Sequence, residues 1–350
     1  MTSTPDCYFA PSFTESRRRF RELSASRGAA LDTLPLTCRG PDNDSLTIDI
    51  AWIGSQTPRH VVVHCSGIHG VEGFTWSAIQ LRALEEIQFV EPTTAVILVH
   101  VLNPYGMAWL RRVNENNVDL NRNWRRPGTW TGMPEVYKEI SGFLNPTAMP
   151  PWDAFYLRAS LVVRKYGMSA LRQAIVGGQY EEPRGLFYGG SHLEEGPVLF
   201  RNWLQSHLAA TQRLSVVDVH TGLGSWRQNS LFYELQAVEA DELPSETAAD
   251  ATPEFAQSTV GGYAVHGGQV DLYRQLFPDV RLSVVTQECG TYAGVRILKA
   301  LRAENYHHHF GNQEVDHPSK VALKNAFCPP SHDWRATVLE NGLKLFLATL

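Results

Sequence analysis

The segment RHVVVHCSGIHGVEGFTWSAIQLRALEEIQFVEPTTAVILVHVL, residues 59–102, decides the fold. It begins and ends with nearly continuous apolar runs, 59–67 and 94–102, of the kind that form strands covered on both faces. The stretch between them, 74–87, has a helical pattern. A strand, a helix and a strand at this spacing predict a βαβ unit with two parallel strands.

The same alternation of strands and helices continues along the chain. LTIDIAWIG (46–54) alternates apolar and polar residues and is predicted to be an edge strand. Further strands are expected at 214–220, 230–236 and 281–288, and helices at 11–27, 134–144, 152–175, 195–210, 291–305 and 332–348. This order predicts an α/β fold whose mixed, largely parallel central sheet is sandwiched by helices.

The composition excludes several classes of protein. Of the 350 residues 43% are hydrophobic and 19% are charged, which is typical of a globular chain. The net charge is -5 and the only dense basic run is RRRFR (17–21), so no nucleic-acid partner is expected. No apolar stretch reaches the roughly 18 residues that cross a membrane, so no membrane partner is expected either.

The cysteines and the N-terminus bear on the cellular location. The five cysteines are scattered and odd in number, which favours reduced thiols and a cytoplasmic protein. The first twenty residues lack a basic start followed by an apolar core, so no secretory signal is predicted. We also expect no inhibitory pro-domain before the catalytic domain.

His69, Glu72 and His220 are candidate metal ligands. His69 and Glu72 stand three apart just past one predicted strand, and His220 ends the apolar run RLSVVDVH. Two imidazoles and a carboxylate leave a zinc ion one open position, and zinc held in this way brings the pKa of a water ligand toward neutrality. The alternative for His220 is a buried histidine whose ring is satisfied by hydrogen bonds.

Glu288 is the candidate catalytic base. It ends RLSVVTQE, a third apolar run. Residues that follow the carboxyl ends of neighbouring parallel strands meet at one edge of an open α/β sheet, which is where such folds bind their ligands. We therefore expect Glu288 beside the three candidate ligands.

The run NPYGMAWLRRVNENNVDLNRNW (103–124) is rich in polar groups of fixed geometry. Arg112 and Arg122 can each offer a planar fork of donors to a carboxylate or a developing oxyanion. Asn121 adds a neutral donor, and Asp119 could bind the far ring nitrogen of a zinc-bound histidine. Without further context the run could also be a solvated polar loop.

Together these motifs resemble the zinc carboxypeptidase superfamily. The superfamily has, in the same order, His-x-x-Glu, an NPDG-like segment with an arginine, VD-x-NRN, a strand-ending histidine and a catalytic glutamate. YAVHGGQVD (263–271) resembles its mobile-tyrosine segment. SGIHGVEGF, FYGG and QECGT look like a bacterial branch of this superfamily that is related to carboxypeptidases and to aspartoacylase and succinylglutamate desuccinylase.

The resemblance implies a role for each matched residue. His69, Glu72 and His220 would bind one zinc ion, and Asp119 would orient His69. Glu288 would be the general base that deprotonates water and passes the proton to the leaving amine. Arg112 would polarise the scissile carbonyl, with the adjacent Arg111 as the alternative. Asn121 and Arg122 would grip a terminal carboxylate, Tyr263 would close over the substrate, and Val270 would lie in the side-chain pocket.

Two departures from the superfamily bear on the substrate. Carboxypeptidases usually have His-Ser at the last ligand, where this chain has His220-Thr221. The stretch between Arg122 and His220 is long, so we expect one catalytic domain over residues 1–350 with an insertion at about 125–213 that shapes the cleft.

The leading hypothesis is a zinc metallohydrolase, most like a metallocarboxypeptidase, that cleaves an amide next to a free carboxylate. The alternatives are an N-acyl-amino-acid deacylase like aspartoacylase and a catalytically silent binding module on the same fold. The expected partner is a small peptide or an acylated amino acid. The side chain of the substrate and the oligomeric state stay open.

Overall fold

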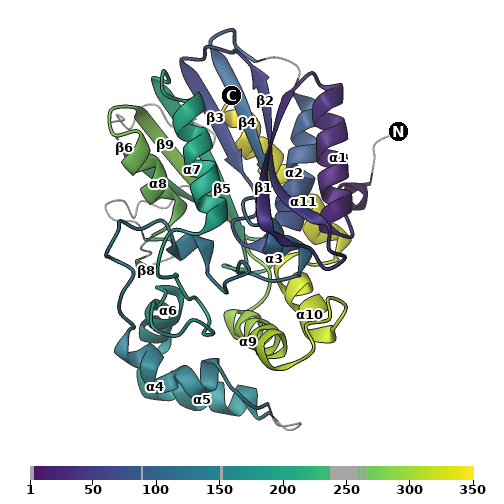
Figure 1. The fold of residues 1–350 in the computed structure, drawn as a ribbon. Coiled ribbons are helices and arrows are strands. Elements are labelled where there is room, and N and C mark those ends of the chain that lie inside the picture. The colour runs from purple at the N-terminus through teal and green to yellow at the C-terminus, as the bar shows by residue number, and fades with distance from the viewer. Residues whose placement is uncertain (1–3, 88–89, 150–152, 237–258, 261–262, 265–266) are drawn as a thin grey trace.

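A seven-stranded mixed sheet forms the centre of the computed structural model, which describes residues 4–87, 90–149, 153–236, 259–260, 263–264 and 267–350 (Figure 1). Its strands are β1 (Ala30–Arg39), β2 (Ser45–Gly54), β3 (His60–Cys65), β4 (Thr94–His100), β5 (Arg213–Thr221), β6 (Asn229–Gln236) and β9 (Arg281–Cys289). Their order is β1-β2-β4-β3-β5-β9-β6, and β4, β3, β5 and β9 run parallel while the other pairs are antiparallel. A separate short pair joins β7 (Thr259–Val260) and β8 (Tyr263–Ala264).

Helices cover both faces of this sheet and one of its ends. They are α1 (Phe13–Ser26), α2 (Gly73–Glu86), α3 (Pro104–Ala108), α4 (Glu135–Leu144), α5 (Phe155–Tyr166), α6 (Met168–Val176), α7 (Glu195–His207), α8 (Gln269–Leu276), α9 (Gly294–Phe310), α10 (Pro318–Phe327) and α11 (His332–Ala348). Short 3-10 turns occur at Pro5–Tyr8, Gly70–Glu72 and Leu120–Arg122. Figure 1 shows α1, α2 and α11 on one face, α7 and α8 on the other, and α4–α6, α9 and α10 gathered beyond one end of the sheet.

The apolar run of β3 shows why the parallel strands read as continuous hydrophobic segments. Val61 and Val63 pack in the cluster that contains Phe200 of α7, whereas Val62 packs in the cluster that contains Phe346 of α11. Successive side chains of a strand point to opposite faces, so a strand between two helix layers needs apolar residues at every position. The predicted mixed, largely parallel sheet between helices is confirmed.

The edge of the sheet differs from the prediction. The segment 46–54 was expected at the edge, but β2 has neighbours on both sides and β1 lies outside it. Strand β1 was not predicted, because Pro35 interrupts its alternation of apolar and polar residues. A proline donates no backbone hydrogen bond, and an edge strand tolerates it because one side of the strand is unpaired.

Two helix predictions also change. The helix expected at 152–175 is divided into α5 and α6 at Gly167, whose φ of 80° is left-handed and stops a right-handed helix. The helix expected at 291–305 begins at Gly294 and continues to Phe310. Helices α3, α8 and α10 were not predicted. In the described part of the chain no helix has the length and apolar character to cross a membrane.

A buried cluster of charges fixes α9 and α10 to the loop after α3. Glu304 Oε1 lies 2.9 Å from Arg111 Nε and 2.8 Å from Lys320 Nζ, and all three residues are buried. Lys320 also donates to the backbone carbonyl of Trp109. Removing one member of a buried ion pair leaves an uncompensated charge, so this cluster holds the segment next to Arg112 in place.

We expect Glu304→Gln to lower the free energy of unfolding by about 3–5 kcal/mol, because Arg111 and Lys320 then stay buried without their counter-ion. Urea unfolding followed by circular dichroism measures the change. The matched control is Glu139→Gln, which removes an exposed ion pair to Lys165 and should leave stability almost unchanged. Equal stability of the two variants would contradict this account.

Candidate metal centre

The candidate ligands lie at the carboxyl ends of neighbouring parallel strands. His69 and Glu72 follow β3, and His220 lies near the end of β5. The turn after β3 depends on glycine: Gly67 has a φ of 64°, and a side chain at Gly70 would come within 2.0 Å of the backbone of Gly106. The residue that follows His69 must therefore be a glycine.

The three side chains converge on one point. Ligand atoms of His69, Glu72 and His220 lie within 4.8 Å of one another, and all three residues are buried. Glu72 Oε1 lies 2.8 Å from His69 Nδ1, and Glu72 Oε2 lies 3.7 Å from His220 Nδ1. Two imidazoles and one carboxylate are the donor set of several catalytic zinc sites, so the residues present fit a zinc ion.

Carboxylates orient both imidazoles from behind. His69 Nε2 lies 3.1 Å from Asp119 Oδ1, and His220 Nε2 lies 3.0 Å from Asp218 Oδ2. These contacts leave the Nδ1 atom of each ring facing Glu72. Such partners fix the ring orientation of a metal ligand.

The sequence motifs predict Asp119 for this orienting role, but they do not mark Asp218. The signal was present, because Asp218 and His220 are two apart in a strand and therefore share one face.

The electrostatics of the centre favour a cation. Burial by itself lowers the pKa of His220, but Asp218, Glu72 and Glu288 outweigh it and raise that pKa to about 9. Burial also opposes ionisation of Asp119, yet Arg112 and His69 hold its pKa well below the usual value. Negative charge therefore accumulates around the point where the ligands converge, which is the environment that a divalent cation requires.

Glu288 faces this centre from the adjacent strand. It pairs in register with His220 across β5 and β9. Its Oε2 atom is buried and makes no hydrogen bond to the part of the chain that the structure describes. Burial, reinforced by Glu72 and opposed by His220 and Arg112, raises the pKa of Glu288 to about 8. A carboxyl group with such a pKa can exchange protons near neutral pH.

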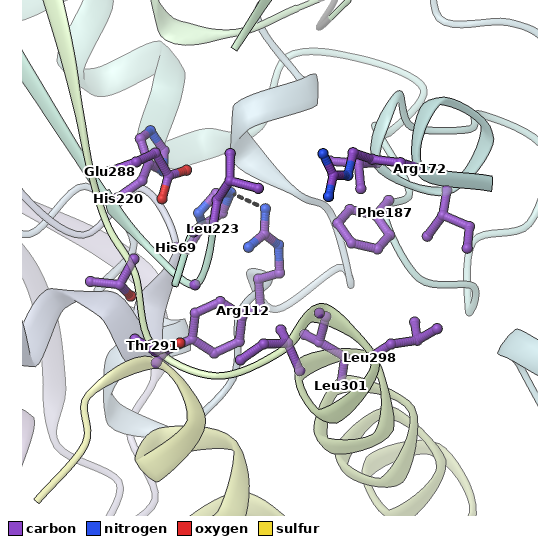
Figure 2. Close-up of a pocket in the computed structure, with 18 of the residues that line it drawn as sticks. His69, Arg112, Arg172, Phe187, His220, Leu223, Glu288, Thr291, Leu298 and Leu301 are labelled. Carbon is purple, nitrogen blue, oxygen red and sulfur yellow. Dashed lines mark hydrogen bonds between the residues drawn. The ribbon is translucent and has the colours of Figure 1, made fainter. Parts of the chain in front are cut away.

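The adjacent arginines point in different directions. Arg112 lines the cavity at the centre, and its Nη2 lies 2.7 Å from His69 Nε2 (Figure 2). Its Nη1 lies 3.3 Å from Glu72 Oε1, and its Nε lies 3.1 Å from Asp119 Oδ2. Arg111 is buried in the cluster with Glu304 and does not line the cavity. Of the two, only Arg112 can reach a substrate beside the ligands.

The residues proposed for carboxylate binding also line the cavity, but they are partly engaged. Arg122 is buried and donates through Nε to the backbone carbonyl of Val176 at 2.9 Å, and through Nη1 to that of Asn121 at 2.7 Å. Asn121 Oδ1 accepts from the backbone of Gln269 at 3.3 Å. Arg122 therefore has fewer donors left for a ligand than the sequence suggested.

Of the other two predicted pocket residues, the structure describes the side chain of only one. Val270 lines the cavity. The backbone of Tyr263 belongs to β8, but its side chain lies outside the described residues. Arg172 of α6, which sequence reasoning did not select, lines the cavity as well, and Figure 2 shows its side chain reaching from α6 toward the centre. Arg172 belongs to no recognisable motif, because only the course of the chain through α6 brings it to the cavity.

The cavity has a volume of about 1130 Å³ and two unlike ends. Figure 2 shows His69, His220 and Glu288 gathered at one end with Arg112 beside them. Apolar side chains of α5, α6 and α9 line the other end. Of the predicted insertion at 125–213, helices α4–α6 contribute to this wall, whereas α7 packs against the sheet.

Several solved structures are similar to this one at low sequence identity. Bovine thrombin-activatable fibrinolysis inhibitor is 11% identical with a TM-score of 0.41, covering 97% of this chain and 99% of its own. Carboxypeptidase A from Helicoverpa armigera is 14% identical with a TM-score of 0.41, covering 93% and 76%. Murein-tripeptide amidase from Escherichia coli O157 is 16% identical with a TM-score of 0.38, covering 84% and 96%.

No curated protein matches the sequence. A family model does match, over residues 9–341, and its description is "Protein of unknown function (DUF2817)". Since this match includes nearly the whole chain and every candidate site residue, the protein belongs to the DUF2817 family.

Proposed function

We propose that this protein is a zinc-dependent hydrolase, most like a metallocarboxypeptidase, that cleaves an amide bond next to a free carboxylate. One observation carries the proposal: the buried ligand atoms of His69, Glu72 and His220 converge within 4.8 Å, with Glu288 on the adjacent strand. The free cysteines of the described chain support a cytoplasmic protein.

His69, Glu72 and His220 would hold the ion, with Asp119 and Asp218 orienting the imidazoles. A zinc ion in such a site supplies Lewis-acid chemistry, since it makes water a stronger acid and polarises a carbonyl oxygen. The backbone N–H of Thr221 donates to Glu72 Oε2 at 2.8 Å and so fixes the carboxylate.

Glu288 would move the proton. Its Oε2 atom accepts a proton from the water that attacks the amide carbon, and the new carbon–oxygen bond forms. The same atom then passes the proton to the amide nitrogen as the carbon–nitrogen bond breaks. The absence of a hydrogen bond to Oε2 within the described residues supports this role, because no described protein group competes for the atom.

Arg112 would stabilise the charge that develops on the carbonyl oxygen. Its guanidinium lies 5.2 Å from the ring centre of Phe187 and 5.9 Å from that of Phe327, so the aromatic faces hold it in the cavity. A preorganised donor of this kind typically contributes about 3–4 kcal/mol to the transition state.

Asn121, Arg122 and Tyr263 would hold the carboxylate side of the substrate. Because Arg122 already donates to two backbone carbonyls, we propose that Arg172 supplies a second cation for the carboxylate. A bidentate arginine orients a carboxylate and contributes to binding more than to bond cleavage.

We expect the purified protein to contain about one zinc ion per chain, and His220→Ala to lose it, because a two-ligand site binds zinc weakly. Inductively coupled plasma mass spectrometry measures the content. His192→Ala is the control, since its side chain is 69% exposed and should not affect zinc. Full zinc retention by His220→Ala would disprove the ligand set.

We expect Glu288→Gln to keep its zinc and lose at least about 100-fold in kcat, because glutamine cannot accept the proton. Steady-state hydrolysis of C-terminal dipeptides and N-acyl amino acids measures this loss and identifies the preferred class. The exposed Glu181→Gln is the control. Unchanged turnover in Glu288→Gln would refute the mechanism.

We expect Arg172→Gln to raise KM about 10-fold or more for free-carboxylate substrates with little change in kcat, because it removes a binding contact and not a proton carrier. Amidated substrates should respond less. Arg164→Gln, an exposed arginine of α5 that does not line the cavity, is the control. A fall in kcat without a change in KM would contradict the assignment.

A further inference from the structure

The far end of the cavity has walls of a different character from the metal centre. We name it the apolar chamber and define it by Val162 and Val163 of α5, Leu171 and Ile175 of α6, and Leu298 and Leu301 of α9. Figure 2 shows Leu298 and Leu301 on α9 facing Phe187 across the cavity. Ile175 and Leu298 pack against both the cluster that contains Phe187 and Leu301 and the cluster of α4 and α5, so the chamber lies where these two clusters meet.

Several of these side chains are only partly covered. Val162, Val163 and Ile175 pack against the cluster around α4 and α5, yet each stays half-buried. The neighbouring Leu161 and Met168 are more than half exposed. Apolar surface that stays open beside a reactive centre is typical of a ligand site, because its burial then contributes to ligand binding.

The chamber is continuous with the proposed reaction site. One cavity contains both, and Arg112, which contacts Phe187, lies among the ligand residues. The total volume of about 1130 Å³ exceeds the roughly 300–1,000 Å³ typical of pockets for drug-sized ligands, and is larger than a short polar dipeptide needs.

We propose that the apolar chamber binds a long apolar group of the substrate, a fatty acyl chain of about eight to twelve carbons, while the amide carbonyl lies at the metal centre. This inference rests on the proposed amide hydrolysis and assigns the substrate class. The amide then joins an acyl chain to an amino acid whose carboxylate lies near Arg122 and Arg172. Helices α5 and α6 of the insertion determine this preference.

The test is the binding of N-acylglycines with acyl chains of two, eight and twelve carbons to the full-length, zinc-loaded Glu288→Gln variant, which should hold them uncleaved. Each fully buried methylene strengthens binding about fourfold. We expect Kd, measured by isothermal titration calorimetry, to fall at least about 100-fold from acetyl to dodecanoyl glycine. Equal Kd values along the series would overturn the proposal.

A chamber variant locates the binding. Val162→Phe in the Glu288→Gln background adds volume at a half-buried position and should raise Kd for dodecanoylglycine at least about 10-fold, with no change for acetylglycine. Val321→Phe, at an exposed position of α10 outside the cavity, is the matched control and should change neither. Equal effects of both variants on the Kd of dodecanoylglycine would mean that the acyl chain binds outside the chamber. If Val162→Phe is unstable, the Kd values of the three N-acylglycines for the Glu288→Gln variant decide the proposal.

Turnover by the wild-type chain separates this inference from the proposed function. Chain-length-dependent binding without hydrolysis of any N-acylglycine or C-terminal dipeptide would retain the chamber and reject the hydrolase. Hydrolysis with kcat/KM independent of chain length would retain the hydrolase and reject the chamber.

Discussion

Compensation of buried negative charge is the constraint on which the rest of the structure depends. Glu72, Asp119 and Asp218 are all buried at one end of the sheet, within one network with His69 and His220. Carboxylates are stable in such surroundings only when cations or hydrogen bonds offset their desolvation. Arg112 supplies part of that compensation, and the convergence of Nδ1 atoms on Glu72 provides the geometry for a divalent ion to supply more.

The architecture separates rigid from variable parts. The candidate site residues stand at the ends of strands that are buried on both faces, where neighbours such as His220 and Glu288 are held in register by the backbone ladder. The adjacent residues Arg111 and Arg112 have different tasks. Arg111 is paired with Glu304 within the packing of α9 and α10, and this contact supports Arg112 in the cavity.

The helices beyond the sheet have the opposite character. Helices α5 and α6 contribute half-buried side chains such as Val162 and Ile175 to the cavity wall. A chemical centre of fixed geometry can serve many substrates when the surrounding segments change, because binding energy far from the reacting bond decides which substrate is positioned. The proposed acyl specificity therefore belongs to α5 and α6 and not to the sheet.

The sequence by itself determined the parallel centre of the fold and the set of groups at the candidate metal centre. Apolar runs that end in His69, His220 and Glu288 are local patterns, and the carboxyl ends of parallel strands must meet at one edge. The tertiary structure alone decided the edge position of β1, the opposite directions of Arg111 and Arg112, and the engagement of Arg122 by Val176. It also brought Arg172 to the cavity. These features depend on contacts between residues far apart in the chain, and such contacts leave no periodic signal in the sequence.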